Sequence, residues 1–345
     1  MNKLLYFCVN DGSDMRTLKE VRSLAKEYDV YYLGVGRGEN AFCQEYCKKF
    51  ELVCGEIKNP FTILKLLKNL VQWRIKYNFS SIHVQEEQLL IISYPFLFGA
   101  HVILDIFDSI FLKKDVRPES LLWLKRLIYN LPRKIIVTDD NRKGLLPKSV
   151  QSKAFVIPNV PIFNSSIYGI QKLSSDKVRL GLFGSLAQKR GVEFAKKLAE
   201  FNPSKYQVVA AGWLADDYSK KFVKSHDVNY LGVMQQEESL RYIAENIDFI
   251  VSIYPLDNMN NINASPNKLY DSVHTKTPII INRGVNVSAF IERLNVGIVI
   301  DDLDTVYEID RKLTAKNFNG SFAYDLAKSN SWDEFESLLI SLHKS

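Results

Sequence analysis

The sequence has few cysteines and no long apolar run, and these absences exclude several classes of protein. Its only cysteines are Cys8, Cys43, Cys47 and Cys54, and no nearby histidine completes a zinc pattern. No run reaches the roughly 18 apolar residues of a transmembrane helix. The apolar start, residues 1–9, is too short for a signal peptide. We therefore expect a cytoplasmic protein with reduced thiols, no membrane span and no bound metal.

Length and charge suggest two domains with different surfaces. A chain of 345 residues exceeds the size at which one core usually stops growing. Residues 1–165 carry 24 Lys and Arg against 17 Asp and Glu, a surplus of +7, whereas residues 166–345 carry 21 against 22. The basic surplus of the first half favours an anionic partner, although a solvated surface gives the same count. No nucleic-acid-reading motif accompanies it, so a nucleic-acid partner is not expected.

Short apolar runs alternate with helical patterns along the first half. This alternation predicts a parallel sheet covered by helices on both faces. Strands are expected at 4–9, 30–33, 51–53, 81–84, 101–105 and 134–138, and helices at about 15–28, 39–49, 60–77, 88–98 and 119–130.

The pattern restarts after a polar linker at 165–177. Strands are expected at 178–183, 206–211, 228–231, 248–252, 278–282 and 297–300, and a final helix at 332–343. The predicted fold class is α/β, with two tandem Rossmann-like domains, a cleft between them and a C-terminal helix packing back toward the first domain. The predicted boundaries are 1–165, 166–325 and 326–345.

The stretch Asn263-Ala-Ser-Pro-Asn-Lys-Leu-Tyr-Asp271 is the main candidate for chemistry. Ser265 suits the N-cap of a helix and Pro266 its first position. Lys268 then opposes the helix dipole, unless its charge and the free N–H groups hold a phosphate. Asp271 lies on the same helical face, where a carboxylate can accept ribose hydroxyls. An ordinary capped helix with a solvated lysine remains the alternative.

Motifs of the second half follow in a defined order. Phe183-Gly-Ser-Leu186 with Lys189-Arg-Gly191 is similar to a G-R-L and K-G pair, and Ser265-Pro-Asn-Lys-Leu-Tyr-Asp271 to S-P-N-K-L-x-E. Pro278-Ile-Ile-Ile281 matches a P-V-I strand. This order resembles that of the retaining GT-B glycosyltransferases of family 4.

The first half carries weaker matches to the same family. Asp14-Met-Arg-Thr-Leu-Lys-Glu20 is similar to its D-x-R-V helix start, and Val156-Ile-Pro-Asn159 to its V-I-P-N-G. His83-Val-Gln85 and Leu104-Asp-Ile-Phe-Asp108 resemble its H-x-H and Y-D-x-H-E strand ends. The resemblance therefore runs nearly from end to end of the chain.

The resemblance implies transfer of a sugar from a nucleotide-diphosphate donor, with retention of configuration and without a metal or other cofactor. It assigns the catalytic roles to Arg190 and Lys268, which neutralise the diphosphate, and to Asp271, which binds the ribose. The other residues that it places at the donor are Gly184, Ser185, Tyr254, Asn263, Ser265, Pro266 and Asn267. The residues that it places at the acceptor or in the cleft are Gly12, Arg16, His83, Asp105 and Asp108. A core histidine at the end of a strand is the alternative interpretation of His83, and the commoner one.

Three positions depart from the family pattern. Asn263 stands where the first Glu of E-x7-E is expected, Ser185 where an Arg follows the glycine, and Phe107 where a His faces the donor sugar. The amide-rich stretch 257–263 could replace these sugar contacts, or form a solvated loop. Two other functions stay open: a nucleotide-sugar epimerase, and a degenerate homologue that binds nucleotide or a partner enzyme without turnover.

Two basic amphipathic stretches, 64–75 and 121–129, suggest the kind of acceptor. Each places Lys or Arg beside Leu, Trp and Ile, as in helices that lie on an anionic membrane. A peripheral position at the inner face of the plasma membrane would suit a glycan or polyprenyl-diphosphate-linked acceptor. Helices that only cover the sheet would show a similar pattern. The resemblance adds capsule, O-antigen or exopolysaccharide synthesis as the expected pathway class.

Overall fold

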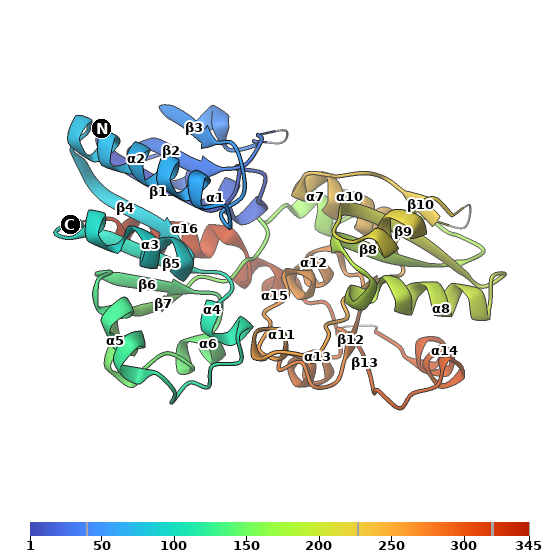
Figure 1. Cartoon of the computed structure of the whole chain (residues 1–345). Helices are drawn as coiled ribbons and strands as arrows, with labels where there is room; N and C mark the ends of the chain where they lie inside the picture. The colour runs from blue at the N-terminus through green and yellow to red at the C-terminus, as the bar shows by residue number, and fades with distance from the viewer. Residues whose placement is uncertain (39–40, 226–227, 319–320, 345) are drawn as a thin grey trace. The chain divides into compact units, whose positions relative to one another are not determined.

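The computed structural model describes residues 1–38, 41–225, 228–318 and 321–344. The chain divides into two compact units. Unit 1 consists of Met1–Asn159 together with Phe335–Ser345, and unit 2 is Val160–Glu334. Each unit is built around its own parallel sheet (Figure 1).

Unit 1 contains a seven-stranded parallel sheet in the order β3-β2-β1-β4-β5-β6-β7. Its strands are β1 (Asn2–Phe7), β2 (Tyr28–Val35), β3 (Lys49–Val53), β4 (Phe79–Gln85), β5 (Val102–Ile106), β6 (Lys134–Val137) and β7 (Ala154–Val156). Strand β1 lies at the centre because Leu4 to Phe7 are fully buried and can be covered on both faces. The strand order reverses between β1 and β4, which is where such sheets place ligands.

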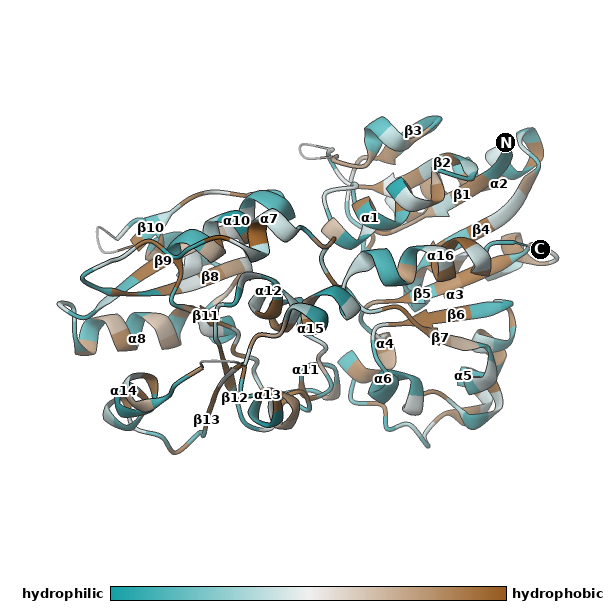
Figure 2. Cartoon of the chain, turned by 180° about the vertical axis from the view of Figure 1, so that it is seen from behind, coloured by the Kyte–Doolittle hydropathy of each residue, from teal (hydrophilic) through white to brown (hydrophobic). Residues whose placement is uncertain are grey.

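Helices cover both faces of this sheet. They are α1 (Met15–Leu24), α2 (Pro60–Lys76), α3 (Glu87–Leu97), α4 (Ile110–Lys113), α5 (Leu122–Asn130), α6 (Asp140–Gly144) and the end of α16 (Trp332–Leu342). Helices α2, α3 and α5 lie side by side on one face, and α1 and α16 cover the other (Figures 1 and 2). Right-handed crossovers explain this division, because the chain moves outward from β1 in both directions.

Side-chain contacts hold the end of the chain in unit 1. Ser23 Oγ and Lys26 Nζ of α1 donate hydrogen bonds to the Glu336 carboxylate at 2.8 and 2.7 Å. Leu339 and Leu342 are buried, so the apolar stripe predicted for the last helix packs against protein.

Unit 2 contains a six-stranded parallel sheet in the order β10-β9-β8-β11-β12-β13. Its strands are β8 (Val178–Leu186), β9 (Tyr206–Leu214), β10 (Val228–Tyr230), β11 (Phe249–Val251), β12 (Ile279–Asn282) and β13 (Gly297–Ile300). Its helices are α7 (Ser165–Tyr168), α8 (Glu193–Phe201), α9 (Asp217–Phe222), α10 (Gln236–Asn246), α11 (Met259–Ile262), α12 (Asn267–Thr275), α13 (Ser288–Leu294), α14 (Val306–Ala315) and α15 (Tyr324–Ser329). The order reverses between β8 and β11.

The strands of both sheets are apolar along most of their length (Figure 2). This agrees with the continuous apolar runs of the sequence and confirms the predicted α/β class with two Rossmann-like sheets. Across the described residues, no helix is long and apolar enough to cross a membrane.

Several predicted elements differ from the structure. The helix predicted at 15–28 ends at Leu24, and the linker predicted at 165–177 begins with helix α7. The helix expected at 39–49 begins in residues 39–40, which lie outside the described residues, and the rest forms only a 3-10 turn at Gln44–Tyr46. Within 41–49 only Cys43 is buried, so the segment has no apolar face to hold a helix against the sheet. Strand β8 continues beyond the predicted loop start at Gly184, through Ser185 to Leu186.

The extension of β8 depends on two glycines that cross. Gly184 pairs with Gly212 of β9, and their φ angles are 101° and 133°. A Cβ added to Gly212 would lie 1.8 Å from the Gly184 carbonyl oxygen. The close approach therefore requires glycine at position 212 and fixes the backbone of Gly184.

We expect Gly212→Ala to destabilise unit 2 by at least about 3 kcal/mol, because the new methyl group meets the Gly184 backbone. Gly232→Ala is the matched control. Gly232 also has a positive φ, 78°, but an added Cβ would meet no atom of the described residues within 4 Å. Its cost should be about 1 kcal/mol, for the left-handed conformation alone. Denaturant unfolding of both variants measures the difference, and equal losses would contradict the steric explanation.

Candidate functional site

Helix α12 begins one residue later than the sequence predicted. Pro266 takes the N-cap position with extended backbone, φ −69° and ψ 122°, and the first helical residue is Asn267. Ser265 therefore lies before the cap, and no side chain of the described residues caps the helix. The first N–H groups of α12 keep their capacity to bind an anion.

Lys268 and Asp271 form an ion pair on the first turns of α12. Lys268 Nζ lies 2.7 Å from Asp271 Oδ2, and the two side chains are 14% and 4% exposed. The other carboxylate oxygen, Asp271 Oδ1, is buried and has no hydrogen-bond partner among the described residues. A buried oxygen without a donor is costly, so this carboxylate is suited to accept a hydrogen bond from a ligand.

The Gly184 backbone reaches the same place from β8. A Cβ added to Gly184 would lie 3.8 Å from Lys268 Cε. The structure therefore brings Gly184 beside the Lys268–Asp271 pair, from which the sequence separates it by 84 residues or more. Ser185, the next residue of β8, is exposed.

Arg190 lies close to the loop that follows β11. Its guanidinium carbon is 5.4 Å from the centre of the Tyr254 ring, and Nη2 is 3.4 Å from Asn261 Oδ1. The next residue, Gly191, has a φ of 95°, and an added Cβ would come within 2.9 Å of Val251. The glycine lets this loop pack on the end of β11, which positions Arg190.

Asn263 is part of the loop framework. Its side chain is 7% exposed, its amide donates to the Met259 carbonyl at 2.8 Å, and its Oδ1 accepts from Asn286 at 2.8 Å. Asn258 likewise caps α11 by accepting from the Asn261 N–H. These amides are engaged with the protein, so contact between Asn263 and a donor sugar stays a prediction that this geometry does not favour.

A cavity of about 600 Å³ lies at the carboxyl ends of the unit 2 strands. Of the predicted donor residues, Tyr254 lines it, whereas Gly184, Lys268 and Asp271 do not. Its other walls include Gln188, Lys189, Glu193, Phe194, Ile253, Asn282, Asp301 and Thr305. Its volume is in the range of small-molecule sites. Tyr254 is thus shared between this cavity and the neighbourhood of Arg190.

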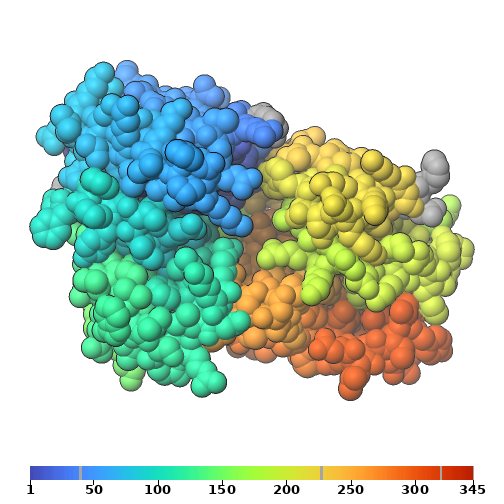
Figure 3. All heavy atoms as spheres, in the orientation of Figure 1, coloured from blue at the N-terminus to red at the C-terminus, as the bar shows by residue number. Residues whose placement is uncertain are grey.

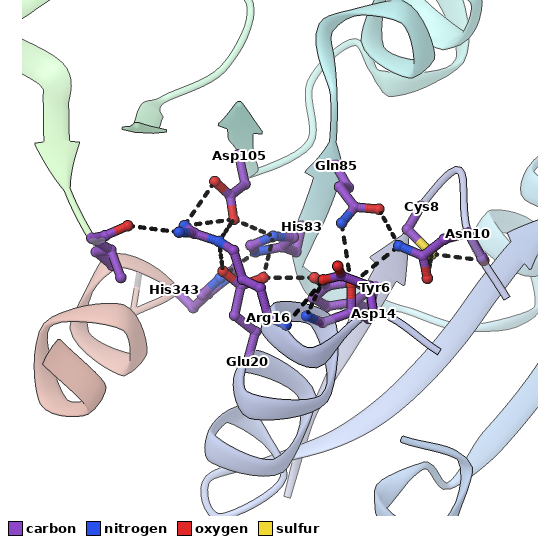
Figure 4. Close-up of polar contacts among 12 residues, drawn as sticks. Tyr6, Cys8, Asn10, Asp14, Arg16, Glu20, His83, Gln85, Asp105 and His343 are labelled. Atoms are coloured by element: carbon purple, nitrogen blue, oxygen red, sulfur yellow. Dashed lines mark hydrogen bonds and ion pairs between the residues drawn. The ribbon is translucent and has the colours of Figure 1, made fainter. Parts of the chain in front are cut away.

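A buried ion cluster occupies the centre of unit 1 (Figure 4). Arg16 Nη2 lies 3.0 Å from Asp105 Oδ1, Nε lies 2.8 Å from Glu20 Oε1, and Nη1 donates to the Ile157 carbonyl at 2.7 Å. These three side chains are at most 1% exposed. Arg16 therefore joins α1, β5 and the residue after β7.

Two histidines extend this cluster toward the end of the chain. His83 Nε2 lies 3.4 Å from Glu20 Oε2 and 3.6 Å from Asp105 Oδ2. His83 Nδ1 lies 3.2 Å from His343 Nε2, and His343 Nδ1 lies 2.7 Å from Ser81 Oγ. Arg16, His83 and Asp105 are thus buried and engage one another, an arrangement that favours a positioning role. Their contact with an acceptor stays a prediction.

Burial determines how the cluster is protonated. It raises the pKa of Glu20 to about 8, to which the Asp105 charge also contributes, and it lowers the pKa of His83 to about 4. Tyr6 Oη donates to Glu20 Oε2 at 2.6 Å. At neutral pH Glu20 is thus protonated and His83 neutral. Arg16 is paired with Asp105, whose pKa is also raised by burial.

Glu20, His83 and Asp105 also have the spacing of a metal site, because their ligand atoms lie within 4.8 Å of one another. Arg16 already donates to both carboxylates. A divalent cation would have to displace or face this buried guanidinium, so these residues do not fit a metal.

Two carboxylates lie at the carboxyl edge of the unit 1 sheet. Asp108 is 44% exposed and lies 3.3 Å from Lys113 and 3.6 Å from Arg142. Its N–H donates to Glu86 Oε1 at 3.2 Å.

Gly12, another predicted acceptor residue, is buried, and its N–H donates to Asn10 Oδ1 at 2.8 Å. Of the predicted acceptor residues, Asp108 is therefore the exposed one.

The sequence reasoning missed Glu86. Its φ of 73° is strained for a residue with a side chain, and burial, with the Asp108 charge, raises its pKa to about 8. A carboxyl with this proton affinity can donate or accept a proton near neutral pH. The sequence signal that could have indicated Glu86 is its place as an acidic residue directly after a buried strand.

Comparisons with known proteins support the fold. No family model matches the sequence, and no curated protein matches it in sequence. Sucrose-phosphate synthase from Thermosynechococcus elongatus superposes with a TM-score of 0.70 at 13% identity, over 99% of this chain and 98% of that chain. HepE from Anabaena, solved with UDP and glucose, gives 0.67 at 14%, over 99% and 97%. UDP-GlcNAc 2-epimerase from Methanocaldococcus jannaschii gives 0.57 at 12%, over 97% and 99%.

These similarities define the class of fold. Two parallel Rossmann-like sheets in tandem, matched over the whole chain, are the GT-B fold that the sequence predicted.

We expect the stability of unit 1 to fall by about 2 kcal/mol between pH 6.5 and pH 8 because of Glu20. The folded state raises the pKa of this carboxyl from 4.5 to about 8, so across that window it keeps a proton that the unfolded chain has lost. His83 acts in the opposite direction, since its pKa falls from 6.5 to about 4, and it destabilises only on acidification below 6.5.

The test is denaturant unfolding of the Glu20→Gln variant at the two pH values. In this variant the free energy of unfolding should no longer show the part of the fall with pH that Glu20 causes. Glu119→Gln removes an exposed carboxylate and should keep the whole decline. A full decline in Glu20→Gln would show that this carboxyl is ionised in the folded protein.

Proposed function

We propose that the chain is a retaining, metal-independent glycosyltransferase of the family 4 type. It moves a hexose from a nucleotide-diphosphate donor to a glycan or lipid-linked acceptor, in capsule, O-antigen or exopolysaccharide synthesis. The observation that carries this proposal is the Lys268–Asp271 pair at the uncapped start of α12, with the Gly184 backbone beside it.

The start of α12 supplies what a diphosphate requires. Uncapped N–H groups and the positive end of the helix dipole attract phosphate oxygens, and Lys268 adds a full charge. Glycine at 184 keeps that neighbourhood free of a side chain, so a phosphate can approach the backbone. When Lys268 turns to a phosphate, Asp271 becomes available to accept the ribose hydroxyls.

Arg190 provides the second cation. It is exposed and contacts the Tyr254 ring, and its hydrogen bond to Asn261 Oδ1 is long, at 3.4 Å, so it can turn toward a ligand at little cost. Departure of a nucleoside diphosphate develops negative charge on the leaving oxygen, and fixed cations stabilise that charge. With Arg190 and Lys268 in this role the reaction needs no metal.

The acceptor belongs to unit 1 in this proposal. Asp108 and Glu86, at the carboxyl ends of β5 and β4, can accept hydrogen bonds from sugar hydroxyls. The basic surplus of the first half suits a polyprenyl-diphosphate-linked acceptor at the inner face of the plasma membrane, with the protein itself cytoplasmic.

Two observations favour other functions. The 2-epimerase from Methanocaldococcus jannaschii shares the fold, and an epimerase would use the same nucleotide site. The engagement of Asn263 with Met259 and Asn286 favours a degenerate homologue that binds nucleotide without turnover. Detection of free nucleoside diphosphate only in the presence of an acceptor would separate transfer from both.

We expect Arg190→Ala to weaken the binding of the recognised nucleoside diphosphate about tenfold to a hundredfold, because a charge-assisted hydrogen bond is lost. Binding of the nucleoside alone should change less than about twofold, since it lacks the diphosphate. A thermal-shift panel of UDP, GDP and ADP identifies the base, and calorimetry gives the affinities. Lys220→Ala, which removes a cation paired with Asp217, is the control. Equal losses of affinity for the nucleoside diphosphate and for the nucleoside would contradict the role assigned to Arg190.

We expect turnover to fall at least about a hundredfold in Lys268→Ala and in Asp271→Ala, and to persist in EDTA. The anomeric configuration of the product, read by NMR, should match that of the donor. Loss of activity in EDTA would contradict metal independence, and an inverted product would contradict the retaining mechanism. Tight nucleotide binding without turnover of any donor would favour the degenerate homologue.

A further inference from the structure

We propose that the outer surface of α2, α3 and α5 is a docking surface for an anionic phospholipid bilayer. This surface, the α2–α3–α5 face, belongs to unit 1. Its apolar members are Phe61, Leu64, Ile75, Ile91, Phe96, Phe98, Leu121, Trp123 and Leu127, and its basic members are Lys65, Lys68, Lys76 and Arg126.

Large apolar side chains on this face are exposed to an unusual degree. Ile75 is 83% exposed, Phe61 81%, Phe98 78% and Trp123 69%. Single exposed apolar residues are ordinary, but a group of them on adjoining helices marks an interaction site. Trp and Phe are also the residues that enter the boundary between lipid head groups and acyl chains.

These side chains are not required to cover the sheet. Helix α2 buries a separate stripe, which includes Leu66, Leu70 and Trp73, against the strands. Phe61, Leu64 and Ile75 lie on the opposite side of the same helix, at spacings of three and eleven residues. The sequence left open whether such helices cover the sheet or bind a membrane. Helix α2 has one apolar stripe that covers the sheet and a second, exposed one that is available to a membrane.

The three helices form one continuous layer. Arg74 of α2 donates a hydrogen bond to the Phe96 carbonyl of α3, and α3 also contacts α5. The light blue to green surface of unit 1 that faces the viewer in Figure 3 includes this layer. The exposed apolar side chains of the α2–α3–α5 face are therefore spread over three neighbouring helices.

The charge of the face selects an anionic partner. Helices α2, α3 and α5 contain one acidic residue, Glu87, and it is fully buried. On α2, Lys65, Lys68 and Lys76 alternate with the exposed apolar residues. Lysine stems can lie along the acyl boundary while their ammonium groups reach the lipid phosphates. Each such cation near an anionic surface strengthens binding, in a way that salt screens.

Unit 2 offers a matched surface without these properties. Leu303 is 93% and Tyr307 66% exposed, but Asp301, Asp302 and Asp304 lie beside them. Exposed apolar residues with acidic neighbours should not bind an anionic bilayer. These two positions therefore serve as the control.

The test is flotation of the full chain with phospholipid vesicles, made of phosphatidylcholine alone or with phosphatidylglycerol. We expect binding only to the anionic vesicles, and at least a tenfold loss when the salt concentration is raised. The triple variant Phe61→Ser, Ile75→Ser, Phe98→Ser should lose binding at least tenfold, and so should Lys65→Glu with Lys68→Glu. The control pair Leu303→Ser with Tyr307→Ser should bind as the unchanged protein does.

Circular dichroism and melting temperature confirm that each variant is folded, which is expected because every changed side chain is exposed. No binding of the unchanged chain to anionic vesicles would overturn the proposal. So would unchanged binding by the variants. A dimer that dissociates in the triple variant, seen by sedimentation, would assign the face to a second copy of the chain.

Vesicle binding and nucleotide binding are separate measurements. Calorimetry with the nucleoside diphosphate should give the same affinity for the triple variant and the unchanged chain. If vesicle binding fails while nucleotide binding persists, the membrane surface is wrong and the transferase proposal stands.

Discussion

A buried guanidinium holds unit 1 together. Arg16 is 1% exposed and carries a full charge, which water would otherwise solvate. It is stable there only because Asp105, Glu20 and the Ile157 carbonyl surround it with acceptors. Removal of Asp105 would leave the buried charge without its counterion, and loss of either other acceptor would leave a guanidinium N–H group without a hydrogen bond. The first helix, the fifth strand and the residue after the last strand are thus fixed relative to one point.

The buried charge of Arg16 also bears on the protonation of its neighbours. Burial disfavours a second charged carboxylate, and the neighbouring Asp105 adds to this effect, so the pKa of Glu20 is raised to about 8. Burial and the neighbouring guanidinium likewise keep His83 neutral, so it can face His343 without repulsion. The carboxylates that remain accessible to a ligand, such as Asp108, lie at the edge of the sheet. Unit 1 therefore keeps its buried structural charges apart from the carboxylates that are exposed at the edge of the sheet.

The fold could be predicted well from the sequence, because continuous apolar runs specify buried parallel strands whatever their neighbours. The site could be predicted in part. The i, i+3 spacing of Lys268 and Asp271 is local, and the structure shows them paired. The burial of Arg16 and Asp105 was not predictable, because a polar residue on a helix or near a strand end can face solvent or the core. A core position for His83 was one of the two interpretations that its strand allowed. The extension of β8 depends on Gly212 crossing Gly184, a contact between residues distant in sequence. The sequence around Asn263 does not indicate that its amide oxygen accepts a hydrogen bond from Asn286, because Asn286 belongs to another segment of the chain.

The position of His343 has a consequence for the order in which the protein can be completed during synthesis. Its ring fills a place in the core of unit 1 beside Ser81 and His83, yet all of unit 2 precedes it in the chain. A ribosome releases residues in sequence order, and domains generally fold as they emerge. The amino-terminal half must therefore wait, with one side of its core open, until the carboxyl-terminal half has been made.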